Sequence, residues 1–170
     1  MKIDYYNGIS GIYFTKIISN IIKIGKLDET EKIILDFGCG SKVLSKKLYK
    51  KKILNYDKNP DYSEHVDYRK LYFDIVVFNH VLMYIKKNEI ISILESIKKI
   101  NHNCELIIGI GKEGLINKLA ALASLNFTAH KGTLTTYEQQ TEILRNYTKI
   151  LKIKKNIFFM TDIYYVKFNN

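Results

Sequence analysis

Two carboxylates and two glycines are the residues of this 170-residue chain whose types and spacing could hold a ligand. Asp36, Gly38 and Gly40 lie in the stretch IILDFGCGSK, directly after an apolar run, and Asp57 follows 21 positions beyond Asp36. Glycines let the backbone approach a ligand closely, and the first turn of a following helix offers unpaired N–H groups that favour an anion. Because Asp36 adds a negative charge, a ligand that carries both a carboxylate and a cationic group fits this stretch better than a pyrophosphate does.

The position of Asp57 favours a ribose ligand. In nucleotide-binding α/β folds, an acidic residue about 20 positions beyond the glycine turn accepts hydrogen bonds from the vicinal hydroxyls of the ribose. Asp57 also stands in the sequence DKNP, which is typical of an ordinary surface turn. A nicotinamide cofactor is disfavoured, since its fingerprint requires glycine at position 43, where Val43 stands, and Asp36 would repel a pyrophosphate.

The elements that must position these residues are predicted by the alternation of apolar runs with helical patterns. Strands are expected at 33–35, 53–56, 73–80 and 106–110, and helices at 42–50, 88–100, 113–125 and 137–147. This succession of βαβ units predicts parallel strands joined by right-handed crossovers. The expected fold is therefore an α/β three-layer sandwich with a doubly wound sheet.

Two places depart from a regular βαβ succession. Only six residues separate Asp57 from Glu64, fewer than a parallel crossover usually needs, so the third strand near 66–68 is expected to be very short or its helix vestigial. Two β-rich runs, 150–160 and 163–168, end the chain. Their short join, Thr161-Asp162, predicts an antiparallel pair.

Residues 9–24 predict an N-terminal helix, because polar residues recur along it at spacings of three and four while its other faces are apolar. The polar stripe consists of Lys16, Ser19 or Asn20, Lys23 and Lys26. Packing on the edge of the sheet is the favoured interpretation; a lid over the ligand with Tyr5, Tyr6 and Tyr13 facing it, or contact with a membrane surface, are the alternatives. We expect residues 1–30 to form a helical cap on a single domain that comprises residues 31–170.

The composition limits the class of protein. The net charge of +10 could indicate nucleic acid or an anionic membrane as partner, but Arg69 and Arg145 are the only arginines, and phosphate recognition tends to use arginine. Cys39 and Cys104 are too few for a disulfide framework or a zinc site. No stretch approaches the roughly 20 apolar residues of a membrane span, and the N-terminus does not resemble a signal peptide. A cytoplasmic protein is expected.

Several segments together resemble the class I S-adenosylmethionine-dependent methyltransferases, in particular the small methyltransferase-domain, type 11-like group. They are ILDFGCGSK, Tyr56-Asp57, FDIVVFNHVLMYI, ELIIGI and the terminal pair of strands, and they run from about Glu31 to the C-terminus. The resemblance implies a Rossmann-like, mostly parallel, seven-stranded sheet with an antiparallel last strand. It also implies S-adenosylmethionine as cofactor, S-adenosylhomocysteine as product and no metal.

The first motif of that family implies roles for four residues. The family's acidic residue lies near the methionine amino group, often through water, and its glycines pass under the cofactor, which corresponds to Asp36, Gly38 and Gly40. Asp57 matches the residue that holds the ribose hydroxyls. Lys42 stands where many members have a third glycine.

The later motifs imply the remaining contacts. Asp67 with Tyr68 matches the acidic residue that reads the adenine amino group. Asn79 and His80 match the strand end that lines the cleft near the methyl group.

A sulfonium methyl is already activated, so such a site mainly aligns the acceptor and excludes water. A base is needed only if the acceptor must lose a proton. His80 is the first candidate for that catalytic role and His130 the second, since imidazole titrates near neutrality. The alternative for either histidine is a hydrogen-bonded residue in the wall of the site.

The methyl acceptor is inferred by elimination. The sequence FNHV lacks the Asp/Asn-Pro-Pro-aromatic signature of enzymes that methylate exocyclic amines of bases, neither cysteine lies where a cytosine C5 methyltransferase has its nucleophile, and there is no appended RNA-binding module. A small-molecule or lipid-like acceptor is therefore expected. An RNA methyltransferase that uses the lysine-rich face and a non-catalytic S-adenosylmethionine-binding subunit remain the alternatives.

Overall fold

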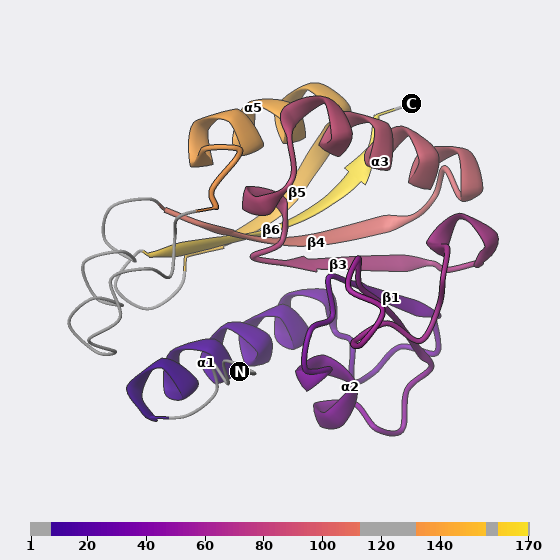
Figure 1. Cartoon of the computed structure of the whole chain (residues 1–170), viewed down its shortest axis with the longest axis vertical. Coiled ribbons are helices and arrows are strands. Elements are labelled where there is room, and N and C mark those ends of the chain that lie inside the picture. Colours follow the sequence, from indigo (N-terminus) through magenta and orange to yellow (C-terminus); the bar gives the residue numbers. More distant parts are fainter. Residues whose placement is uncertain (1–7, 113–131, 156–159, 170) are drawn as a thin grey trace.

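The computed structural model describes residues 8–112, 132–155 and 160–169, and in them a six-stranded sheet lies between two layers of helices (Figure 1). The strands are β1 Ile34–Phe37, β2 Ile53–Tyr56, β3 Ile75–Asn79, β4 Glu105–Gly111, β5 Thr148–Lys155 and β6 Thr161–Phe168. The helices are α1 Gly8–Gly25, α2 Val43–Lys47, α3 Lys87–Ile100 and α5 Tyr137–Tyr147, with 3₁₀ turns η1 Tyr68–Lys70 and η2 Leu82–Tyr84. The expected helix at 113–125 and His130 lie outside the described residues.

The sheet confirms the predicted Rossmann-like α/β class. Its strand order is β2-β1-β3-β4-β6-β5. Strands β1 to β4 are parallel to one another, and β6 is antiparallel to both of its neighbours, β4 and β5. The described residues form six strands, where seven were expected. β1 is buried on both faces, as the apolar run before Asp36 predicts for a central parallel strand.

The third strand expected near 66–68 is replaced by η1. Asp67 caps this turn: its Oδ1 accepts a hydrogen bond from the backbone N–H of Arg69 at 3.0 Å. Local bonding of this kind offers the backbone an alternative to a sheet ladder. The consequence is that β2 is the last strand on its side of the sheet in the part of the chain that the structure describes.

The terminal hairpin is antiparallel, as predicted, but its turn was misplaced. Thr161 and Asp162 are the first two residues of β6 and pair with Gly111 and Ile110 of β4. β5 ends at Lys155, six positions before Thr161. The two-residue join was therefore wrong, because both residues belong to a strand that enters the sheet between β4 and β5.

Helix α1 covers one face of the sheet. The favoured expectation, that it would pack on the edge of the sheet, was therefore wrong. Ile17 and Ile21 of this helix are fully buried and belong to one hydrophobic cluster with Ile107 of β4 and Ile163 of β6. Lys16, Lys23 and Lys26 are exposed, as the polar stripe predicts, but Asn20 is buried. Figure 1 shows α1 and α2 together on this side of the sheet. No helix of the described ranges is long and apolar enough to cross a membrane.

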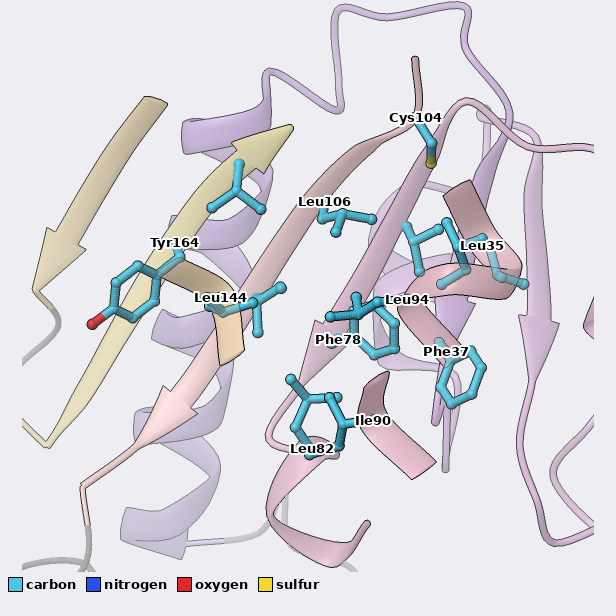
Figure 2. Packing of buried hydrophobic residues seen from close by; sticks show 14 of the residues in the cluster. Leu35, Phe37, Phe78, Leu82, Ile90, Leu94, Cys104, Leu106, Leu144 and Tyr164 are labelled. Carbon is cyan, nitrogen blue, oxygen red and sulfur yellow. The ribbon is translucent and has the colours of Figure 1, made fainter. Parts of the chain in front are cut away.

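Helices α3 and α5 cover the opposite face (Figure 1). Phe78 of β3, Leu106 of β4 and Leu94 of α3 are each fully buried and belong to one cluster (Figure 2). The ring of Phe37 packs against the ring of Phe78 at 5.0 Å between centroids. These two packed faces hold the carboxyl ends of β1, β2 and β3, and with them the candidate site, in fixed relative positions.

Candidate active site

Asp36 is a buried carboxylate at the carboxyl end of β1, with 5% of its surface exposed. No hydrogen bond or ion pair joins that carboxylate to another residue of the described ranges. Burial, and to a lesser extent the negative charge of Asp57, raises the pKa of Asp36 from 3.8 to about 7. Burying an unpaired charge is costly, so the arrangement favours a cationic ligand group beside Asp36.

The two glycines after β1 have different surroundings. Both have left-handed backbones, with φ of 77° at Gly38 and 46° at Gly40. A Cβ on Gly38 would lie 2.4 Å from Cγ2 of Val81, whereas a Cβ on Gly40 would meet nothing within 4 Å. Gly38 is therefore needed for packing, and the space beside Gly40 is open to a ligand.

Asp57 lies at the tip of β2, the strand that neighbours β1, and fixes the glycine turn. Its Oδ2 accepts a hydrogen bond from the backbone N–H of Gly40 at 3.0 Å, and its Oδ1 accepts one from the N–H of Asn59 at 2.9 Å. A carboxylate has further lone pairs, so Asp57 can still accept hydrogen bonds from hydroxyl groups. The structure thus brings Asp36, Gly38, Gly40 and Asp57 together at one edge of the sheet, as the sequence predicts.

Lys42 takes the place of a third glycine and keeps a left-handed backbone, with φ of 59°. Its Nζ lies 2.8 Å from Oε1 of Glu64, and Glu64 Oε2 accepts a hydrogen bond from Nδ2 of Asn55 at 2.9 Å. These partners, first Lys42, lower the pKa of Glu64. The shortened segment after Asp57 therefore supplies the group that holds Lys42. Helix α2, expected over 42–50, has five residues.

Asp67 and Tyr68 already have partners within the chain. Asp67 accepts hydrogen bonds from Nε and Nη2 of Arg69 at 2.8 and 3.1 Å, and these bonds lower its pKa. The buried ring of Tyr68 packs on Phe37, and its hydroxyl bonds to Oγ of Ser96 at 2.7 Å. An adenine contact would have to share Asp67 with Arg69, and this assignment stays a prediction.

Asn79 and His80 lie at the carboxyl end of β3, next to the end of β1. Oδ1 of Asn79 is buried and has no hydrogen-bond partner in the part of the chain that the structure describes. His80 has φ of 58°, and its backbone N–H donates to the carbonyl of Gly109 at 3.0 Å. Its Nε2 lies 3.1 Å from Oγ1 of Thr161. Thr161 was not identified from the sequence, because nothing in the primary structure shows which strand β6 would join.

The site and the fold together define a class of protein: a Rossmann-like three-layer sandwich with carboxylates at the tips of two neighbouring parallel strands and a glycine turn between them. Residues 10–103, more than half of the chain, match the sequence model of a family described as "Methyltransferase domain". The chain belongs to this family.

Solved structures share the fold at low sequence identity. The PH0226 protein from Pyrococcus horikoshii OT3 matches with a TM-score of 0.71 and 13% identity over 96% of this chain and 93% of that one. Magnesium protoporphyrin IX methyltransferase (ChlM) from Synechocystis PCC 6803, with bound S-adenosylhomocysteine, matches with a TM-score of 0.61 and 15% identity over 96% and 88%. The small RNA methyltransferase HEN1 matches with a TM-score of 0.68 and 14% identity over 96% of this chain but 26% of that one. No curated protein sequence matches the chain.

Proposed function

We propose that the chain transfers a methyl group from S-adenosylmethionine to a small-molecule or lipid-like acceptor. The observation that carries this proposal is the buried carboxylate of Asp36, unpaired among the described residues and close to the open space at Gly40, in a chain of this family. The ammonium of the cofactor's methionine part would supply the missing counter-charge, directly or through one water. Its sulfonium would supply an activated methyl group.

Each of the predicted residues would then contact a different part of the cofactor. Asp36 would hold the amino group, Gly38 and Gly40 would let the backbone pass beneath the cofactor, and Asp57 would accept the ribose hydroxyls. We assign Asp67 and Tyr68 to the adenine end.

At the other end, Asn79 and His80 would line the methyl-transfer site. His80 would act there as a base or as a hydrogen-bond donor, according to which ring nitrogen carries the proton. His130 is the second candidate. The chain's contribution to catalysis would be to align the acceptor and to exclude water.

A small acceptor is supported by the match to ChlM, a magnesium protoporphyrin IX methyltransferase, over 88% of that protein's length. The small RNA methyltransferase HEN1 aligns over only 26% of its length. The RNA alternative has its own test: RNA affinity that falls steeply with salt, together with methyl incorporation into RNA, would favour it over a small acceptor.

Asp57→Ala is expected to weaken binding of S-adenosylhomocysteine by about 1–3 kcal/mol, roughly 5- to 150-fold, because the ribose hydroxyls lose their hydrogen-bond acceptor. Calorimetric titration measures the change. Asp61→Ala, an exposed acid in the same loop, serves as the matched control and should bind as the wild type does. Unchanged affinity in Asp57→Ala would refute the ribose assignment.

The proposed function is tested by titrating the wild type with S-adenosylmethionine and S-adenosylhomocysteine in a calorimeter, followed by a turnover assay on a cell extract. Binding with turnover supports the proposal. Binding without turnover on any extract favours a non-catalytic subunit. Absence of binding for both compounds contradicts the proposal and its alternatives.

A further inference from the structure

Three side chains that are distant in sequence meet at the carboxyl end of β3: Tyr13 of α1, His80 and Thr161 of β6. Nε2 of His80 lies 3.1 Å from Oγ1 of Thr161. The same Oγ1 forms a hydrogen bond with the hydroxyl of Tyr13, 148 positions earlier in the chain. Thr161 is fully buried, and Phe14 packs edge-on against the imidazole at 5.9 Å between ring centroids. The three groups form a continuous hydrogen-bonded chain.

This chain is placed by the sheet and not by local sequence. Thr161 pairs with Gly111, and Asn79 pairs with Gly109, so β4 contributes glycines where the side chains of β3 and β6 meet. A Cβ on Gly109 would lie 3.8 Å from Cδ2 of His80 and 3.3 Å from Oδ1 of Asn79. The imidazole therefore lies close above a strand that leaves room for it, beside the proposed methyl-transfer site.

The direction of the hydrogen bonds follows from the chemistry of the groups. A phenol is a stronger donor and a weaker acceptor than an aliphatic hydroxyl, because its oxygen lone pair is delocalised into the ring. Burial raises the pKa of Tyr13, so its hydroxyl keeps the proton that it donates. Thr161 has a single hydroxyl hydrogen. If Tyr13 donates to Thr161, that hydrogen is directed to Nε2 of His80, which then carries a lone pair.

We propose that Thr161 and Tyr13 are positioning residues that hold neutral His80 in the tautomer with its proton on Nδ1. In that tautomer the lone pair of Nε2 is engaged by Thr161, so this lone pair is not available to take a proton from a methyl acceptor. This role at the acceptor end rests on the proposed function. The tautomer itself does not, and it can be measured in the protein without substrate.

The test is nitrogen-15 NMR of the imidazoles in histidine-labelled protein at pH 8, where the two ring nitrogens distinguish the tautomers. His80→Gln identifies the resonances of His80. In the wild type we expect Nδ1 to carry the proton. Thr161→Val, which keeps the shape of the side chain, and Tyr13→Phe should each shift the tautomer ratio toward Nε2–H by about 3- to 10-fold, the effect of losing one hydrogen bond. Thr161→Ser should restore the wild-type ratio.

Two results would overturn the proposal: a wild-type His80 with its proton on Nε2, or an unchanged ratio in both Thr161→Val and Tyr13→Phe. Urea unfolding of each variant shows whether it is folded, and Tyr13→Phe, which removes one half-buried hydroxyl, gives the answer even if Thr161→Val does not fold. Titration with S-adenosylhomocysteine separates the two claims. If the wild type does not bind S-adenosylhomocysteine, this result would count against the proposed function but would not affect the conclusion about the tautomer.

Discussion

Replacing Asp36 by asparagine is expected to raise the free energy of unfolding at pH 8 by about 2–4 kcal/mol and to change it little at pH 4. The wild-type carboxylate is buried without a partner among the described residues, and its pKa is about 7 in the folded chain against an ordinary value of 3.8. Keeping it charged above pH 7 opposes folding, with an upper limit of about 4 kcal/mol from the difference between those values. Asparagine is neutral at every pH and avoids this cost.

The sign of the pH dependence follows from proton binding. Between about pH 4 and pH 7 the folded wild type holds a proton on Asp36 that the unfolded chain has released, so folding stability falls as pH rises through this window. Urea unfolding at pH 4, 6 and 8 measures the effect. Asp28→Asn, an exposed acid, is the control and should leave the pH profile unchanged. A wild type and an Asp36→Asn variant with parallel profiles would contradict the assignment.

The same variant should lose affinity for S-adenosylhomocysteine, because its amide carries no charge to pair with the ligand's ammonium. A charge-assisted hydrogen bond contributes about 1.5–3 kcal/mol, so the expected loss is roughly 10- to 150-fold. Binding to the wild type at pH 7 should also release part of a proton from Asp36, which calorimetry in buffers of different ionisation enthalpy detects. Asp36 would thus lower the stability of the free protein at the place where it holds the cofactor.

Gly38→Ala is expected to lower the free energy of unfolding by about 2–5 kcal/mol, the sum of left-handed backbone strain and overpacking. Its new Cβ would lie 2.4 Å from Cγ2 of Val81 at a φ of 77°. Gly40→Ala should cost only about 1–2 kcal/mol, since strain alone applies where no atom lies within 4 Å. It should instead weaken cofactor binding, because the methyl group enters the space proposed for the ligand.

Chemical denaturation and calorimetric titration of both variants separate packing from binding. The double variant Gly38→Ala with Val81→Ala removes the clash and should recover part of the lost stability, but not the part due to backbone strain. Equal stability losses in the two single variants, or a Gly40→Ala protein that binds the cofactor as tightly as the wild type, would show that the two glycines do not differ in the way that their surroundings indicate.

Much of the fold could be predicted because buried parallel strands and amphipathic helices have strong sequence patterns. The strand Ile53–Tyr56 and the helix Tyr137–Tyr147 have the predicted bounds. The errors lie where local bonding overrides periodicity. At Asp67 a capped 3₁₀ turn replaces a strand, and after the left-handed Lys42 the lysine-rich pattern forms only one short helix.

The candidate site likewise contains residues that could be predicted from local sequence and residues that could not. Asp36, Gly38, Gly40 and Asp57 could be predicted because one βαβ unit brings them together within 22 residues of sequence. The partners of His80 could not be predicted, since they depend on the register of β6 and on which face of the sheet α1 covers. Tyr13 was considered only as part of a lid, whereas its hydroxyl bonds to Thr161.

The central claim, that Asp36 holds the amino group and Asp57 the ribose of one cofactor, is tested most directly by a crystal structure of the protein with S-adenosylhomocysteine. We expect the ligand's amino nitrogen within hydrogen-bond distance of the Asp36 carboxylate, or one water away, and both ribose hydroxyls on Asp57, with the ligand passing over Gly40. A ligand bound elsewhere on the chain, or one whose ribose does not reach Asp57, would contradict it.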